Sequence, residues 1–305
     1  MNLASAVITL GLLVASPPPA KVAPPSAPSQ PWKSTALPKP MAAPEKEGAV
    51  EVDGVKLWWA SFGAGEPVFL LHGGAGNSEH WGNQIPALAE RYRVIVVDAR
   101  GHGRSTRTEA AYSYHRMAED LLAVMDALEL KQASLVGWSD GGVVGLDLAV
   151  HHPERVKKLF AFGANYDLSG MKSGGGPHAT FGTYFAKCSS DYQRLSPTPK
   201  DYKAFNAALS KMWRSQPNFK PADLARITAA TACADGEYDE IIKQDHVRAM
   251  AKLIPNGQVV LIPEASHFAL WQRPDAFNKA VLDFLADPPA ASDKPATEPA
   301  AAGKP

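Results

Sequence analysis

A serine flanked by glycines is the residue of this 305-residue chain best suited to covalent chemistry. It lies in the Gly-Trp-Ser-Asp-Gly stretch at residues 137–141, between an apolar run at 133–136 and a helix-like segment at 142–151. A sharp turn from strand to helix holds the serine hydroxyl above a sheet, and glycine leaves the room that such a turn needs. The pattern therefore predicts that Ser139 is a nucleophile.

A glycine-rich loop follows the strand-like run at residues 68–71. A backbone N–H of this loop could join the N–H of the residue after the nucleophile in holding an oxyanion. The two amides would be those of Gly74 and Asp140. Such a loop could instead cradle phosphate, but neither G-x-x-x-x-G-K-S/T nor a full G-x-G-x-x-G is present, so the oxyanion role is preferred.

A late histidine and an acidic loop could activate the serine. His267 follows the apolar run at residues 259–262, and neutral imidazole, with a pKa near 6.5, can accept the proton of a hydroxyl group. Asp239 lies in a loop after a weak late strand, where its carboxylate could orient the histidine. Glu237 and Glu240 in the same loop are rival acids.

Four other histidines have structural interpretations. His72 belongs to the glycine-rich loop, and His102 belongs to a turn at residues 98–105 that positions a loop and a helix. His151 and His152 end a helix-like segment. No catalytic role is predicted for these four residues.

The elements that must position the site alternate between strand and helix. A hairpin with the turn Asp53-Gly54 opens the domain, and unbroken apolar runs of the kind found in buried parallel strands follow it. Apolar residues at helical spacing occur at 117–128 and 277–285. The alternation predicts a doubly wound α/β fold with a mostly parallel sheet.

Composition divides the chain unevenly. Ten of the 26 prolines lie between residues 17 and 44, and five lie in the tail. We expect a proline-rich disordered linker at 17–48, one domain at 49–287 and a disordered tail at 288–305. An aromatic-rich insertion at about 165–222 is predicted to form a lid over the strand ends or, alternatively, a rigid helical cap.

The start of the chain favours export. Residues 3–15 are mostly apolar, too few to span a bilayer but suitable for the core of a signal peptide at 1–16. A cytoplasmic protein with an unusual leader is the alternative. The net charge of zero argues against nucleic acid or membrane partners and favours a small-molecule substrate. Cys188 and Cys233 match no metal motif and are interpreted as lone thiols.

The order of Ser139, Asp239 and His267 along the chain is that of α/β-hydrolases and differs from those of chymotrypsin and subtilisin. Residues from about 50 to 285 resemble an α/β-hydrolase fold enzyme. The resemblance implies an eight-stranded sheet with an inserted helical lid. It is carried by the motifs Leu-His-Gly-Gly, Asp-x-Arg-Gly-His-Gly-x-Ser, Gly-Trp-Ser-Asp-Gly-Gly, Gly-x-x-Asp and Ser-His-Phe.

The stretch around Ser139, together with Phe-Gly-Ala-Asn at residues 162–165, is similar to the biphenyl hydrolase-like group, which includes valacyclovir hydrolase, and to many bacterial esterases. In that group the acid after the nucleophile helps to bind a substrate amino group, so the Asp140 side chain becomes a candidate substrate contact, as does neighbouring Trp138. Alternatively, Asp140 only begins a helix, where a carboxylate is favoured by the helix dipole.

These residues predict a serine esterase that acts through an acyl-enzyme and requires no metal or organic cofactor. The expected substrate is a small carboxylic ester. Lactonases, carbon–carbon bond hydrolases and cofactor-free perhydrolases use the same triad and remain alternatives. A non-catalytic binding protein on the same scaffold is a further alternative. Dehalogenases and epoxide hydrolases of this fold are disfavoured because they have Asp at the position of Ser139.

Overall fold

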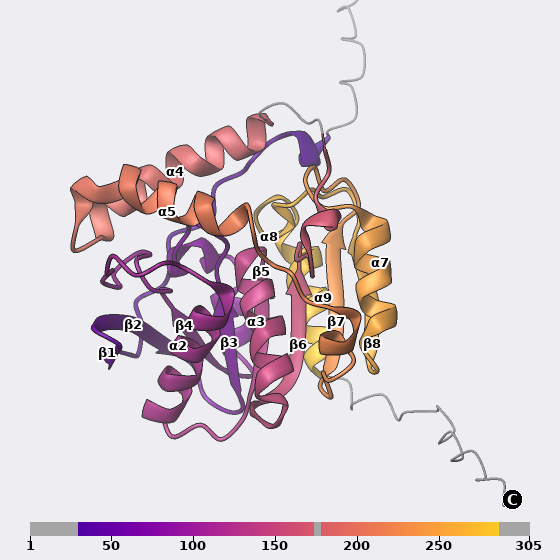
Figure 1. Cartoon of the computed structure of the whole chain (residues 1–305), viewed down its shortest axis with the longest axis horizontal. Helices are drawn as coiled ribbons and strands as arrows, with labels where there is room; N and C mark the ends of the chain where they lie inside the picture. The colour runs from indigo at the N-terminus through magenta and orange to yellow at the C-terminus, as the bar shows by residue number, and fades with distance from the viewer. Residues whose placement is uncertain (1–29, 174–177, 287–305) are drawn as a thin grey trace, which may run out of the picture.

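The computed structural model describes residues 30–173 and 178–286. Its centre is an eight-stranded sheet with the order β1-β2-β4-β3-β5-β6-β7-β8 (Figure 1). β2 pairs antiparallel with β1 and with β4, and all other neighbours are parallel, which confirms the predicted fold class. The strands are β1 (Lys46–Val52), β2 (Val55–Phe62), β3 (Pro67–Leu71), β4 (Arg93–Val97), β5 (Ala133–Trp138), β6 (Val156–Phe162), β7 (Ala230–Gly236) and β8 (Gly257–Ile262).

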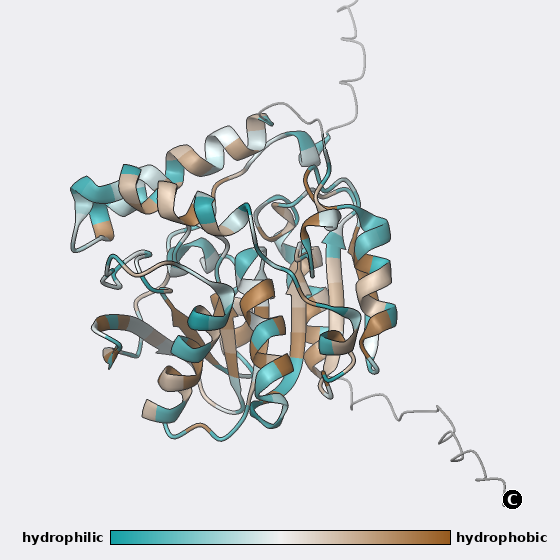
Figure 2. Ribbon diagram, viewed as in Figure 1, coloured by the Kyte–Doolittle hydropathy of each residue, from teal (hydrophilic) through white to brown (hydrophobic). Residues whose placement is uncertain are grey.

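The central strands are buried because helices cover both faces of the sheet. All six residues of β5 are buried, and the central strands are brown in the hydropathy view (Figure 2). α2, α3 and α7 pack along one face, whereas α1 and α9 pack together on the other. The α-helices of the described residues are α1 (Ile85–Ala89), α2 (Tyr114–Ala127), α3 (Asp140–His151), α4 (Ala179–Leu195), α5 (Tyr202–Trp213), α6 (Pro221–Leu224), α7 (Gln244–Leu253), α8 (Ala269–Gln272) and α9 (Pro274–Ala286). Five short 3-10 helices also occur in this part of the chain: η1 (Pro31–Lys33), η2 (Ser78–Trp81), η3 (Pro153–Arg155), η4 (Leu168–Gly170) and η5 (Pro199–Asp201).

Helix α2 begins at a side-chain cap. The Ser113 hydroxyl accepts a hydrogen bond from the Arg116 backbone N–H at 3.1 Å, which satisfies one of the unpaired amides of the first turn. Tyr114 and His115 therefore lie in the first turn of α2, and α2 packs along α3.

The aromatic-rich insertion is helical. α4, α5 and α6 all occur between β6 and β7, and α4 and α5 lie across one end of the sheet, at the top of Figure 1. This placement agrees with the predicted inserted helical lid. Because parallel strands deliver their carboxyl ends to that edge, the insertion lies over the loops that carry the candidate site.

The predicted linker differs from the structure in its second half. β1 begins at Lys46, three residues before the expected start of the domain, because residues 46–48 pair with β2. Upstream, the Trp32 ring stacks on Tyr238 with 4.2 Å between ring centroids, and Thr35 donates from its hydroxyl to the Thr180 carbonyl of α4. A proline-rich composition predicts an extended chain, but an extended chain can still dock where aromatic and backbone partners are available.

Several other expectations concern the ends of the chain and the cysteines. The predicted signal peptide at 1–16, the first part of the linker and the tail at 288–305 lie outside the described residues. Among the helices of the described ranges, none is long and apolar enough to cross a membrane. Cys188 and Cys233 are separate, buried thiols, as predicted.

The N-terminal segment at residues 30–45 packs so closely against Gly82 that no side chain fits there. A Cβ atom at this position would lie 1.9 Å from the Lys39 carbonyl oxygen, so Gly82→Ala must displace the segment. We expect a loss of stability on the order of 1–3 kcal/mol in thermal or urea unfolding, with faster proteolysis near Lys39. Gly182→Ala is the matched control, because a Cβ there meets nothing within 4 Å inside helix α4, and it should be neutral or stabilising. Equal stability of the two variants would contradict this packing.

Candidate active site

Ser139 occupies a strained turn between β5 and α3. Its backbone has φ 55° and ψ −119°, a conformation that residues other than glycine rarely adopt. A Cβ on Gly137 would lie 2.3 Å from the Gly141 carbonyl oxygen, and a Cβ on Gly141 would lie 2.1 Å from that of Leu71. Both glycines are therefore required by close backbone contacts. The Ser139 N–H donates to the Phe162 carbonyl at 2.7 Å, which anchors the turn to β6.

His267 and Asp239 form a buried pair. The distance from His267 Nδ1 to Asp239 Oδ2 is 2.6 Å, and both side chains are almost completely shielded from solvent. The other carboxylate oxygen, Asp239 Oδ1, accepts hydrogen bonds from the backbone N–H groups of Ile241 and Ile242 at 2.7 and 2.8 Å. These three contacts hold the carboxylate in one orientation toward the imidazole.

The rival acids have other partners. Glu237 accepts a hydrogen bond from the Glu264 backbone N–H at 3.0 Å. Glu240 accepts from the His267 backbone N–H at 2.9 Å and from the Thr180 hydroxyl at 2.5 Å. Glu240 therefore supports the loop that carries the histidine, whereas Asp239 is the acid that contacts the histidine ring.

The position of the His267 ring is determined by two neighbours that the sequence did not single out for this purpose. Trp138 Nε1 donates to the His267 carbonyl at 2.8 Å. Gly163, at φ 62°, leaves room for the ring, since a Cβ there would lie 2.7 Å from His267 Cε1. His267 Nε2 is buried and has no hydrogen-bond partner among the described residues. The nitrogen opposite the Asp239 contact is thus available to a substrate or nucleophile.

The two side chains shift each other's protonation. Burial would lower the pKa of His267, but the charge and hydrogen bond of Asp239 outweigh burial and raise this pKa above its ordinary value. Burial would likewise raise the pKa of Asp239, but neighbouring His267 keeps it below its ordinary value. The pair favours an anionic carboxylate beside an imidazole that accepts protons readily.

Two buried histidines hold the glycine-rich loop. His72 Nε2 accepts a hydrogen bond from the Ala99 backbone N–H at 3.1 Å, and His102 Nε2 accepts from that of Ala75 at 3.2 Å. Burial lowers the pKa of both imidazoles, which favours the neutral form that can accept these bonds. These contacts agree with the prediction that His72 and His102 position loops. They connect the loop that carries Gly74 to the turn after β4.

A cavity of about 250 Å³ lies between the strand ends and the lid helices. Asp239 lies behind His267, and the other predicted site residues all line this cavity. Its remaining wall is largely apolar and aromatic, with side chains from the lid. The predicted residues that line it are Gly74, Trp138, Ser139, Asp140 and His267, and the lid contributes Phe181, Tyr184, Phe185 and Trp213.

The Asp140 side chain lies in this cavity and has two neutral partners. Tyr114 donates from its hydroxyl to Oδ1 at 2.9 Å, and Trp213 donates from Nε1 to Oδ2 at 2.8 Å. Burial raises the pKa of Asp140 although both donors favour the anion. Asp140 also begins α3, as one of the two interpretations of this residue expects. The contacts of Tyr114 and Trp213 with Asp140 were not predicted, because no local pattern in the sequence places these residues beside residue 140.

Gly74 lies directly against this carboxylate. A Cβ at Gly74 would come within 2.4 Å of Asp140 Oδ2 and 2.5 Å of the Trp213 ring, so the loop requires glycine there. The Gly74 carbonyl accepts a hydrogen bond from the Tyr184 hydroxyl at 2.7 Å. The lid helix α4 thereby fixes the orientation of the peptide that follows Gly74.

Comparison with known proteins points to one family. Residues 66–197 match the alpha/beta hydrolase fold family. "Putative carbamate hydrolase RutD" of Caulobacter sp. (strain K31) is 30% identical over 249 residues, which cover 72% of this chain and 90% of that protein. A 2-hydroxy-6-oxo-6-(2'-aminophenyl)hexa-2,4-dienoic acid hydrolase of Metapseudomonas resinovorans is 27% identical and spans 78% of this chain and 90% of its own length.

A solved structure of similar architecture is that of Est816, described as an N-acyl homoserine lactone degrading enzyme. It superposes with a TM-score of 0.62 at 29% sequence identity and covers 78% of this chain and all of its own.

The Asp239 contact can be tested through the protonation of His267. In Asp239→Asn the carboxylate charge is lost while burial remains, so we expect the pKa of His267 to fall from above its ordinary value to below it. The pH dependence of the His267 ring signals in NMR measures this change. Glu240→Gln is the control and should lower the pKa by much less. An unchanged midpoint in Asp239→Asn would show that the carboxylate does not govern the imidazole.

Proposed function

This chain belongs to the α/β hydrolase fold family and is a hydrolase, and we propose that it cleaves small carboxylic esters through Ser139, His267 and Asp239. The observation that carries the proposal is the 2.6 Å contact between His267 Nδ1 and Asp239 Oδ2, with His267 Nε2 left unpaired among the described residues. Ser139 and His267 line the same cavity. This arrangement supports a nucleophile, a base and an acid that orients the base.

In the proposed mechanism, Ser139 Oγ attacks the ester carbonyl while His267 Nε2 accepts the hydroxyl proton. Asp239 holds the Nδ1–H and stabilises the positive imidazolium that forms. The backbone N–H groups of Gly74 and Asp140 hold the oxyanion, and His267 returns the proton to the leaving alcohol. Water then adds to the acyl-enzyme with His267 again as base, and the carboxylic acid and free Ser139 are released.

The cavity supports a small, uncharged or cationic substrate. About 250 Å³ is at or below the lower end of typical ligand pockets, and the wall is mostly apolar and aromatic. Among the described lining residues there is no lysine or arginine, and Asp140 adds a carboxylate. An anionic substrate would therefore be repelled. Trp138 and the lid aromatics are suited to contact an apolar acyl or aryl group.

The negative charge of the cavity favours esters over the anionic substrates of one alternative, carbon–carbon bond hydrolysis. The relative from Metapseudomonas resinovorans is named for the hydrolysis of a dienoic acid, which is anionic at neutral pH, and this cavity lacks a cation among its described residues to pair with such a group. Lactones are cyclic esters and require the same attack on a carbonyl. The similarity to Est816 therefore favours lactones as the second substrate class.

Substitution of the nucleophile or the base tests the mechanism. We expect Ser139→Ala and His267→Ala to lower kcat/KM for p-nitrophenyl acetate by about 10⁴-fold or more while far-UV circular dichroism is unchanged. A fluorophosphonate probe should label the wild-type protein and fail to label Ser139→Ala. Ser34→Ala, on the exposed N-terminal segment, is the control and should retain labelling. Retained turnover in either site variant would refute the assignment, and a non-catalytic binding protein should not react with the probe at all.

The Asp140 carboxylate is expected to select for charge. At a separation of about 4 Å a cation gains about 1–4 kcal/mol from a carboxylate, so we expect Asp140→Asn to raise KM for a protonated amino-acid p-nitrophenyl ester about tenfold or more. The neutral butyrate ester, assayed on the same variant, is the control and should change about twofold or less. Parallel changes for both esters would indicate that Asp140 acts only as the start of α3.

A further inference from the structure

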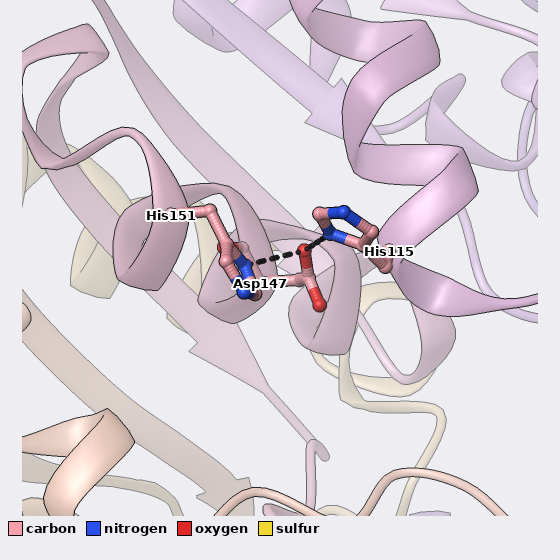
Figure 3. Close-up of side chains that lie close together, drawn as sticks. All are labelled: His115, Asp147 and His151. Atoms are coloured by element: carbon pink, nitrogen blue, oxygen red, sulfur yellow. Dashed lines mark hydrogen bonds and ion pairs between the residues drawn. The ribbon is translucent and has the colours of Figure 1, made fainter.

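A second group of chemically active side chains lies outside the catalytic cavity. His115 from the first turn of α2 and His151 from the last turn of α3 both point to Asp147, which lies one turn before His151 (Figure 3). The two Nδ1 atoms lie 2.9 and 3.0 Å from the same oxygen, Asp147 Oδ1. The proposed esterase mechanism uses none of these residues.

The burial of the group resembles that of a binding site. The Asp147 side chain is only 7% exposed, whereas those of His115 and His151 are 55% and 39% exposed. The carboxylate is therefore the buried member of the group, and the two imidazoles lie closer to the solvent. Asp147 and His151 are four residues apart on α3, so the helix itself keeps them on one face. His115 is held nearby because α2 packs along α3.

We propose that His115, Asp147 and His151 form a binding site for a divalent transition metal ion, with Zn²⁺ as the best fit. Two imidazole nitrogens and one carboxylate oxygen are typical ligands of Zn²⁺, whereas Mg²⁺ and Ca²⁺ prefer oxygen ligands alone. With bonds of about 2.0–2.1 Å, tetrahedral ligands lie about 3.3 Å apart. The ligand atoms here all lie within 4.8 Å of one another, so small side-chain rotations suffice.

The surroundings leave space for a fourth ligand. His115, Asp147 and His151 line an open depression of about 370 Å³, which Asn218 and Asp223 also border. Water can therefore complete the coordination of the ion. A neutral imidazole binds a metal ion through the ring nitrogen that carries no proton, and the carboxylate offsets one of the two positive charges of the ion.

The sequence held one local signal for this site. Asp-x-x-x-His at residues 147–151 has the spacing that places two ligands on consecutive turns of a helix. The third ligand, His115, comes from another helix, and no metal ligand was predicted from the sequence. Neighbouring His152, directly after α3, contacts Glu119 of α2 at 2.9 Å, but among the described residues it forms no comparable three-ligand group with that carboxylate. His152 is therefore a matched control.

Calorimetric titration of the chelator-treated full chain with zinc chloride tests the site. We expect one Zn²⁺ per chain with affinity weakened at least tenfold in His115→Ala and in His151→Ala, and unchanged affinity in His152→Ala. Zn²⁺ should raise Tm of the wild-type protein and of His152→Ala, because binding to the folded state alone stabilises it, and should not raise Tm of the two ligand variants. Both imidazoles are partly exposed, so these variants should fold, and circular dichroism checks this.

Three results would overturn the site: no zinc binding at 100-fold molar excess, equal affinity in the wild-type and His115→Ala proteins, or loss of binding in His152→Ala. Ser139→Ala, which tests the catalytic proposal, should bind Zn²⁺ as tightly as the wild-type protein. Failure of one proposal is therefore distinguishable from failure of the other.

Discussion

Close backbone packing at the turn between β5 and α3 is the constraint on which the rest of the site depends. Contacts of 2.1 and 2.3 Å at the Cβ positions of Gly141 and Gly137 leave no space for side chains. The turn can then raise Ser139 above the strand ends in a backbone conformation that costs energy. Because the neighbouring strands are parallel, the loops that carry Gly74, Asp239 and His267 meet at the same edge of the sheet.

The residue before the nucleophile connects the turn to its surroundings. Trp138 is buried, and its Nε1 donates a hydrogen bond to the His267 carbonyl, so the end of β5 is joined to the loop after β8. Its ring meets those of Tyr184 from the lid and Trp271 from α8 at centroid distances of 5.3 Å each. Such edge-to-face pairs contribute about 0.5–1.5 kcal/mol each beyond the burial of their area. The nucleophile, the base and the lid therefore share one packed aromatic support.

The carboxylates of the interior differ in how their charge is balanced. Asp120 pairs with the Arg100 guanidinium, and Asp191 binds Lys187 at 2.9 Å. Asp140 instead has the two neutral donors Tyr114 and Trp213, which satisfy its hydrogen bonds without cancelling its charge. Burial of a negative charge at a substrate cavity raises the free energy of the folded protein unless a bound cation compensates it. This imbalance is the physical basis for expecting charge selection at the site.

The sequence alone determined the features that are local or periodic. Unbroken apolar runs predicted the buried strands, Asp53-Gly54 predicted the hairpin, and glycine spacing with chain order predicted the Ser139 turn and the residues around it. Only the tertiary structure decided which acid reaches His267, because Asp239 and Glu240 lie in one loop and differ in direction. It likewise brought Tyr114 to Asp140, His115 to Asp147, and residues 30–45 onto the surface of the domain. These contacts join segments far apart in the chain, so no local propensity or period records them.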